Sequence, residues 1–515
     1  MQHDTSPSTL STGRGKRLLL LLCAVAFLDF VDASIVNIAL PHIRAALGFS
    51  TQELQWVPSG YLLTYGGFML LGGRLADLLG RRRVLLAGIA IVGLASLAGG
   101  FAGHAEVFVA ARLVQGLGAA LMLPAALSTL TTAFRASTDR QKALGVWGAV
   151  AGLSSAVGIL LGGVLTEGPG WRWVMFVNPI ACAALIPLVW RMLPRSARAE
   201  RRTAPDRLGG LLITGAMLLL VFALVKAPDQ GWGSARTWWE LAGSAVLFGA
   251  FAANEHAVRS PLLPLSILRV RGLAAANLTG LIGFAGMLSM FFFLTLYMQN
   301  VLGYSPIAAG AAYLPLTVGI GVSSGIGAKL LARIGSRAVI CGGALTAAAG
   351  LFLLAQLPVH GTYLTDILPG LLVFSLGVGP VFVGVTSAAN AGVAPDQAGL
   401  AAAILNSAQQ TGGALGLAIF SAVAASQSGH LLAGGASGAA ATAGGFHRAL
   451  LTGCGFAVAA ALIALRTAST RTDAMHAVPD RPGTPAAPAA RLLAPPGATS
   501  PAAGDGPADK EEVPL

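Results

Sequence analysis

The sequence predicts an all-α membrane protein with about fourteen spanning helices. Of its 515 residues, 55% are hydrophobic and only 10% are charged, whereas about a quarter of an average soluble chain is charged. So few charges do not cover the surface of a water-soluble fold, but lipid-facing residues are apolar and need none. The chain contains 67 glycines, and small residues of this kind let membrane helices pack closely. Aromatic residues make up only 7%, which disfavours a membrane β-barrel with aromatic girdles.

A spanning helix needs about 20 mainly apolar residues, and runs of this kind recur along the chain. The first is too long for a signal-peptide core and contains Asp29 and Asp32, so we interpret it as a retained helix. The runs lie at 18–40, 54–73, 84–103, 106–131, 142–166, 172–193, 208–226, 238–254, 273–300, 307–332, 337–357, 364–388, 398–425 and 447–466.

Lysine and arginine are distributed unevenly over the segments between these runs. With the N-terminus inside, 27 of the 33 Lys and Arg residues fall in inside segments, five fall outside, and Arg112 lies within a span. Cytoplasmic loops are enriched in Lys and Arg. The pattern therefore predicts a multi-pass protein of the bacterial inner membrane with both termini cytoplasmic. The net charge of +12 follows from this topology, and we expect no nucleic-acid partner.

The order of the runs predicts two six-helix bundles with two extra helices between them. A proline- and alanine-rich tail closes the chain and has the composition of a disordered segment. The predicted parts are a cytoplasmic tail (1–17), the first bundle (18–193), a basic cytoplasmic linker (194–207), the two additional helices (208–254), a cytoplasmic loop (255–272), the second bundle (273–466) and a disordered cytoplasmic tail (467–515).

One loop occurs in similar form in both predicted bundles. Residues 73–83 (GRLADLLGRRR) follow the second helix of the first bundle, and residues 328–337 (AKLLARIGSR) follow the second helix of the other. Repeated halves with a substrate site between them are a layout of secondary transporters. The chemistry of the first loop suits a conformational latch, with its candidate residues Gly73, Asp77, Gly80, Arg81 and Arg82. The alternative is an ordinary basic loop that obeys charge topology. In the second loop Ala332 replaces the acidic residue, which predicts a weaker latch.

Two carboxylates lie inside the first predicted helix. Asp29 and Asp32 are three residues apart and therefore share a helix face. Ionised carboxylates at membrane depth are costly, so they are usually functional or paired. We expect Asp32 to couple protons or bind a cation, the alternative being a packing residue satisfied by Asn37 or a neighbouring hydroxyl. For Asp29 we favour the packing interpretation over the functional one.

Arg112 is the one basic residue that we place within a span, so its guanidinium is expected to face the bundle interior. It either tunes a carboxylate or donates to backbone carbonyls. Gln115 and Gln409 either line a cavity or bridge helices. Residues 291–293 and Tyr297 form an aromatic wall for a substrate or pack against lipid and core.

Together these segments resemble the major facilitator superfamily, and within it the fourteen-helix drug–proton antiporters. The loop 73–83 matches the superfamily's loop signature. Residues 28–41 (LDFVDASIVNIALP) resemble the first-helix motif of that branch, with its aspartate at Asp32 and Ser34 in place of the usual threonine. Residues 112–120 (RLVQGLGAA) are similar to the intramembrane arginine motif, and residues 171–179 (WRWVMFVNP) to the signature before helix six. The second half matches mainly in helix count and in residues 406–413.

The resemblance implies a major facilitator fold and proton-driven export of small amphipathic drugs or antibiotics by alternating access. It implies proton-coupling or substrate roles for Asp32, Arg112, Asp29, Asn37 and Gln115. The fifth-helix antiporter motif departs from the family at one position: residues 158–163 read GILLGG, with Ile159 where proline is usual. Gly158, Gly162 and Gly163 keep the close helix packing, but strict antiport is left open.

Other classes of function fit the sequence less well. A metabolite importer or uniporter of the same superfamily is the main alternative. The eight histidines lie in tails or at helix ends, the four cysteines lack metal-ligand spacing, and no phosphate-binding loop is present. We therefore expect no enzyme activity, no metal and no cofactor, and we expect the proton-motive force to drive transport. The expected partners are a small-molecule substrate, protons and the lipid bilayer, with the protein itself a monomer. Frequent Ala, Gly and Arg with little Lys is typical of a high-GC bacterial genome.

Overall fold

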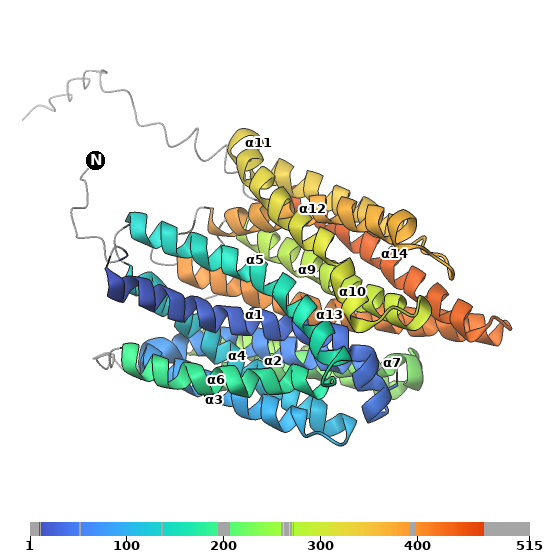
Figure 1. Ribbon diagram of the computed structural model, residues 1–515, viewed down its shortest axis with the longest axis horizontal. Helices are drawn as coiled ribbons and strands as arrows, with labels where there is room; N and C mark the ends of the chain where they lie inside the picture. The colour runs from blue at the N-terminus through green and yellow to red at the C-terminus, as the bar shows by residue number, and fades with distance from the viewer. Residues whose placement is uncertain are drawn as a thin grey trace, which may run out of the picture.

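The computed structural model describes residues 10, 12–50, 53–134, 137–193, 206–258, 261, 267, 270, 272–391, 393 and 398–467, and within this part the chain is helical without strands (Figure 1). The helices of the first half are α1 (Gly13–Leu47), η1 (Glu53–Gln55), α2 (Trp56–Leu79), α3 (Arg81–Gly100), α4 (Ala105–Ala133), α5 (Ser137–Glu167) and α6 (Arg172–Met192). Then follow α7 (Arg207–Gln230) and α8 (Ala235–Ala257). The second half contains α9 (Leu273–Leu296), the π-helical turn η3 (Tyr297–Val301), α10 (Pro306–Ala312), α11 (Leu314–Leu354), the π-helical turn η4 (Tyr363–Ile367), α12 (Leu368–Asn390), α13 (Ala398–Ala433) and α14 (Gly438–Ala464).

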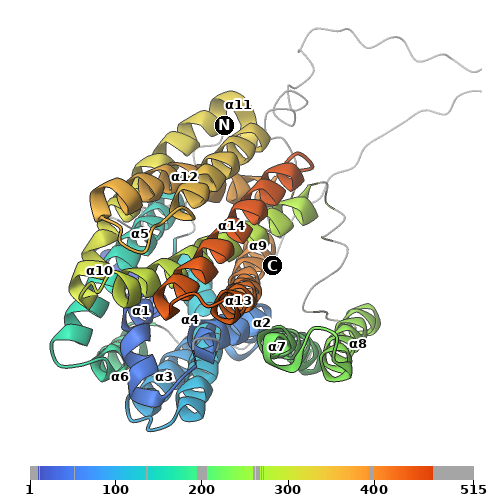
Figure 2. The same ribbon diagram turned by 90° about the vertical axis from the view of Figure 1, so that its right-hand side faces the viewer.

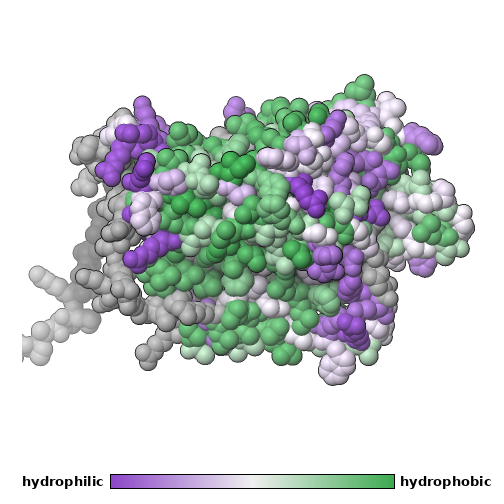
Figure 3. Space-filling view, turned by 60° about the horizontal axis from the view of Figure 1, so that its bottom comes forward, coloured by the Kyte–Doolittle hydropathy of each residue, from purple (hydrophilic) through white to green (hydrophobic). Residues whose placement is uncertain are grey.

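The outer surface has the composition of a membrane protein. On the face shown in Figure 3, a broad hydrophobic band crosses the middle of the molecule, and hydrophilic residues gather toward both ends. Ten helices of the described part are long and apolar enough to cross a membrane. Each of the fourteen predicted runs overlaps a helical segment, but fourteen membrane crossings stay a prediction. The all-α membrane fold itself is confirmed.

Most predicted helix boundaries differ from the structure by several residues, and three differences concern the course of the chain. Helix α1 begins at Gly13, so the last residues of the predicted tail 1–17 are helical. The predicted ninth helix ends in the π-helical turn η3. The runs 307–332 and 337–357 are joined within α11, where Gly335 interrupts the helix with φ 80° and ψ 164°. Glycine has no Cβ and adopts this backbone at little cost, so one residue makes the turn that we expected from a loop.

Gly80 and Gly335 hold the same position in the two similar loops. Gly80 separates α2 from α3 with φ 95°, and Gly335 turns α11 with φ 80°. The same backbone geometry at matching positions supports a repeated half.

The helices pack as two groups. In the first group α2 and α3 pack on α4, α1 on α5, and α3 on α6; in the second, α9, α13 and α14 pack together and α11 packs on α12 and α14. Helices α7 and α8 pair with one another at the side of the molecule, where α7 contacts α2 and α13 (Figure 2). Most of the predicted linker 194–207, and the tail 467–515 beyond Thr467, lie outside the described residues.

The most extensive hydrophobic core shared by the two groups lies at one end of the molecule. There, one cluster joins Ile35 and Ile43 of α1 with Phe293 of α9 and Phe420 of α13. At the end nearer the start of α1 there are two smaller clusters. One belongs mainly to the first group and also includes Ala414 and Ala418 of α13. The other belongs mainly to the second group. The halves are therefore closed against each other at the end remote from the start of α1.

Candidate functional site

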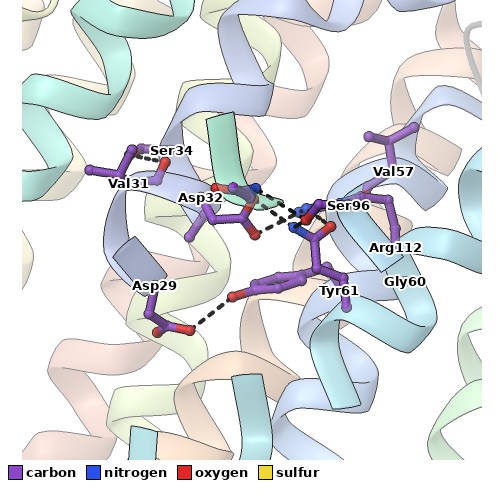
Figure 4. A network of polar contacts seen from close by, with 12 residues as sticks. Asp29, Val31, Asp32, Ser34, Val57, Gly60, Tyr61, Ser96 and Arg112 are labelled. Atoms are coloured by element: carbon purple, nitrogen blue, oxygen red, sulfur yellow. Dashed lines mark hydrogen bonds and ion pairs between the residues drawn. The ribbon is translucent and has the colours of Figure 1, made fainter. Parts of the chain in front are cut away.

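A buried polar cluster surrounds Asp32 in the middle of the first group (Figure 4). Asp32 is 1% exposed, and its carboxylate accepts hydrogen bonds from three side chains. Oδ2 accepts from Nη1 of Arg112 at 3.2 Å, while Oδ1 accepts from Nε2 of Gln115 at 2.7 Å and from Nδ2 of Asn178 at 2.5 Å. Charge-assisted hydrogen bonds of this kind are stronger than neutral ones. The cluster therefore joins α1, α4 and α6 at one carboxylate.

Arg112 is also 1% exposed and donates several hydrogen bonds within the bundle. Besides Asp32, it donates to Oε1 of Gln115 at 2.7 Å and to the carbonyl of Val57 at 3.1 Å. Its guanidinium carbon lies 4.3 Å above the ring of Tyr61, a cation–π contact. Arg112 thus pairs with a carboxylate and donates to a backbone carbonyl, and its tuning of Asp32 stays a prediction.

Ser96 and Asn178 complete the cluster and were not among the predicted site residues. The Ser96 hydroxyl accepts from Gln115 at 2.8 Å and from Asn178 at 3.3 Å. Asn178 stands in the quoted segment 171–179, so a signal for it existed. Ser96 has no such signal, because a serine in an apolar helix is common and its partners come from other helices.

Asp29 has a different environment, although it is one turn from Asp32 on α1. Its Oδ1 accepts from the Tyr61 hydroxyl at 3.3 Å and its Oδ2 from the Tyr65 hydroxyl at 2.8 Å. Both tyrosines come from α2, and all three side chains are at most 2% exposed. Tyr61 and Tyr65 were missed as site residues. Their four-residue spacing on one helix face is the only sequence signal for them.

Asn37 lies apart from this cluster. Its side-chain amide donates to the carbonyl of Ala33 on its own helix, at 3.4 Å. The alternative in which Asn37 satisfies Asp32 is therefore wrong, since Arg112, Gln115 and Asn178 do so. Ser34 also turns to its own helix and donates to the carbonyl of Phe30.

The loop residues of the predicted latch contact the first group. Arg81 donates to the hydroxyls of Ser128 and Thr132 on α4, at 2.7 and 2.9 Å. The guanidinium of Arg82 lies 4.4 Å from the ring centre of Trp190 on α6. A Cβ on Gly73 would meet Pro124 of α4 at 3.8 Å. The Asp77 side chain lies outside the described residues, so its part in a latch stays a prediction.

The three predicted glycines of α5 face close neighbours. A Cβ on Gly158 would lie 2.1 Å from the Ser34 hydroxyl, and one on Gly162 would lie 2.5 Å from the carbonyl oxygen of Ile35. Both neighbours belong to α1. A Cβ on Gly163 would approach the carbonyl of Pro306 on α10, in the other group, to 2.8 Å. These glycines let α5 contact both α1 and the second group of helices.

The aromatic residues of α9 and η3 are mostly core. Phe292, Phe293 and Tyr297 are at most 2% exposed and belong to the cluster shared by both groups, and Phe291 packs on the ring of Tyr313. The packing interpretation therefore fits them better than an aromatic wall. Gln409 lines an apolar pocket of the second group together with Phe284, Met287 and Phe374. Among the described residues, no three His, Cys, Asp or Glu side chains lie close enough to hold a metal.

Comparison with known proteins gives consistent results. The profile of the Major Facilitator Superfamily matches residues 22–417. The puromycin resistance protein of Streptomyces alboniger is 40% identical, over 91% of this chain and 94% of its own length. The cephamycin export protein of Amycolatopsis lactamdurans is 38% identical, over 81% of this chain and 87% of its own.

Solved structures of transporters share the fold at low sequence identity. An auto-inhibited peptide transporter of the POT family has a TM-score of 0.66 and 15% identity, covering 87% of this chain and 96% of its own. A bacterial homologue of the human lysosomal transporter Spinster, in an inward-facing conformation, has a TM-score of 0.64 and 16% identity, covering 88% of this chain and 97% of its own.

Proposed function

The chain belongs to the Major Facilitator Superfamily, and we propose that it exports small amphipathic compounds, drugs or antibiotics, across the bacterial plasma membrane in exchange for protons. The observation that carries the proton coupling is the buried carboxylate cluster of α1. Asp29 and Asp32 are both buried among apolar helices, and Arg112 pairs with Asp32. Ionisable groups at membrane depth are expensive and typically mark ion or proton pathways.

Export is favoured over import by the relatives. Two of them, at 38–40% identity, are named for antibiotic resistance or export. A metabolite importer or uniporter would share the fold but has no observation in its favour. The substrate class of this chain is therefore proposed to be a small antibiotic-like compound.

The packing of the two groups suits alternating access. The most extensive shared hydrophobic core closes the molecule at one end. At the other end there are two smaller clusters, one mainly of the first group and one mainly of the second. If the separate ends face the cytoplasm, as the Lys and Arg distribution predicts, a cytoplasmic compound enters between the groups there. The machinery that we propose for coupling is the Asp32–Arg112–Gln115 cluster together with Asp29. The glycines of α5 allow close contacts with α1 and with α10, and we propose that the contact with α10 changes as the two groups move.

Transport by the reconstituted protein tests this function. Purified protein is placed in liposomes, a pH gradient is imposed, and the accumulation of radiolabelled puromycin is followed with and without a protonophore. Protein-free liposomes serve as the control. We expect accumulation against a concentration gradient that collapses when the protonophore is added. Equal movement of the compound with and without the gradient would refute proton coupling, and absence of any movement would exclude puromycin as a substrate.

A further inference from the structure

We propose that Asp29, held by Tyr61 and Tyr65, is the group that binds and releases the transported proton, while Asp32 remains ionised and positions Arg112. This inference rests on the proposed proton-coupled export. It reverses the roles that the sequence favoured for the two aspartates.

The partners of the two carboxylates differ in kind. Asp32 has a guanidinium and two side-chain amides as donors. Asp29 has two phenol hydroxyls, and among the described residues no Lys, Arg or His forms an ion pair with it. A buried charge is tolerated when it is paired and hydrogen-bonded. Asp32 therefore has a stable ionised state, and Asp29 does not have an equivalent one.

The charge balance of the cluster leads to the same assignment. Arg112 carries one positive charge, and its direct ionic partner is Asp32 at 3.2 Å. With both aspartates ionised, the buried group carries one uncompensated negative charge. One proton on Asp29 neutralises the group without disturbing the Asp32–Arg112 pair. A single proton on Asp32 would instead leave Arg112 without its direct partner.

Among the residues that the structure describes, no other ionisable side chain offers an equivalent compensating charge near Asp29. Its helix contributes Asp32. The helices packed on α1 are α2, α4, α5, α6, α9 and α10. Of these, α2 contributes Tyr61 and Tyr65, α4 contributes Arg112, and α6 contributes the uncharged thiol of Cys182. The sequence of α5 between Lys142 and Glu167, and the sequences of α9 and α10, contain no ionisable residue.

Tyr61 links the proton site to Arg112. Its hydroxyl donates a hydrogen bond of 3.3 Å to Asp29, which is longer than the one from Tyr65. The centre of its ring lies 4.3 Å from the guanidinium carbon of Arg112. When a proton from water forms an O–H bond on the Asp29 carboxylate, the carboxyl becomes a donor and needs one phenol donor fewer. The Tyr61 hydroxyl is the weaker contact and is released first. Release of the proton to water restores both bonds, so protonation alters the position of a ring that packs on Arg112.

Substitution of Asp29 provides the main test. The liposomes described above are used with the wild type, with Asp29→Asn and with Asp366→Asn, a control carboxylate at the helix end η4 that is bound by Thr362. Two quantities are measured: accumulation of puromycin driven by the pH gradient, and exchange of labelled for unlabelled puromycin without a gradient. Asp29→Asn is expected to lose gradient-driven accumulation and keep exchange, while Asp366→Asn behaves as wild type. If Asp29→Asn accumulates puromycin as wild type does, the assignment is overturned.

Failure of the proposed export function can be distinguished from failure of the Asp29 assignment, because the wild-type protein alone tests proton-coupled export. If the wild type ignores the gradient, proton-coupled export is wrong, and the proton role of Asp29 falls with it. If the wild type responds and Asp29→Asn responds equally, export stands and only the inference falls.

Substitution of Tyr65 tests the site without removing the carboxylate. Loss of the phenol donor in Tyr65→Phe makes the ionised form of Asp29 less favourable. The pH dependence of gradient-driven transport should therefore move toward alkaline pH by about one to two units. Tyr313→Phe is the matched control, because Tyr313 is equally buried and its hydroxyl pairs with Thr295 in the other group. A Tyr65→Phe profile that coincides with wild type would overturn the proposal, even if Asp29→Asn were inactive in both assays.

Discussion

Asp29 and Asp32 lie one turn apart on α1, yet Asp32 is bound by a guanidinium and Asp29 by two phenols. The two carboxylates thus differ in charge compensation although both are at most 2% exposed. A proton bound at one of them has a different consequence from a proton bound at the other. Environments that separate two carboxylates in this way are how one site assigns them different roles.

Asp32→Asn is expected to abolish gradient-driven transport while the protein still folds. The variant leaves Arg112 as the positive charge and Asp29 as the negative charge of the cluster, so Asp29 stays ionised as the remaining counter-charge. Loss of the charged acceptor lowers the free energy of unfolding by about 1.5–3 kcal/mol. Thermal unfolding in detergent and puromycin accumulation measure the two effects. A variant that concentrates puromycin as well as wild type would show that Asp32 has no role in coupling.

Gly162→Ala is expected to separate α5 from α1. A Cβ at this position would lie 2.5 Å from the carbonyl oxygen of Ile35, so the backbones must move apart, at a cost of about 1–3 kcal/mol. Gly148→Ala on the same helix is the control, because its Cβ would meet nothing within 4 Å. Thermal unfolding should show a lower midpoint for Gly162→Ala and an unchanged or slightly higher one for Gly148→Ala. Equal midpoints would mean that the contact between these helices adjusts freely.

Gln299→Met is expected to loosen the closed end of the molecule. The Gln299 side-chain amide donates to the carbonyl of Ile38 at 2.8 Å and so connects η3 with α1 across the two groups. One such hydrogen bond contributes about 0.5–1.5 kcal/mol. The fraction of molecules that are open at this end should therefore rise by about two- to tenfold. The labelling rate of a cysteine in place of the buried Ala309, in a protein without other cysteines, measures this population. Gln356→Met, at an exposed site, is the control and should leave the rate unchanged.

Glu53→Gln is expected to lower the free energy of unfolding slightly at neutral pH and not at acidic pH. The hydrogen bond from Ser50, with a smaller contribution from Lys226, lowers the pKa of Glu53 below its ordinary value of 4.5. A carboxyl with a lowered folded-state pKa stabilises the fold above its unfolded value, and this contribution is lost as the pH falls through the folded pKa. The pair with Lys226 is partly exposed, so the loss at neutral pH is about 0.5 kcal/mol. Unfolding of both proteins between neutral and acidic pH measures it. A difference that persists in strong acid would show that packing, not charge, is responsible.

Features that depend on neighbouring residues in the chain could be predicted from the sequence, whereas contacts between distant residues could not. The sequence placed Asp32, Arg112 and Gln115 inside helices and named them as site residues, and the structure brings them together. It also identified Gly80 and the similar loop around Gly335, both with positive φ. These features depend on local composition, because hydropathy, charge and glycine content are read within one helix or turn.

Tertiary structure alone decided the partners of each buried group. Asn178 is 146 residues from Asp32 and reaches it only because α6 and α1 pack in one register. Tyr61 and Tyr65 of α2 point to Asp29, and the side chain of Asn37 turns back to its own helix. An apolar helix fixes which residues are buried, but its rotation and depth against its neighbours decide which polar atoms meet. Those two quantities arise from the packing of all helices at once, so no single segment of the sequence contains them.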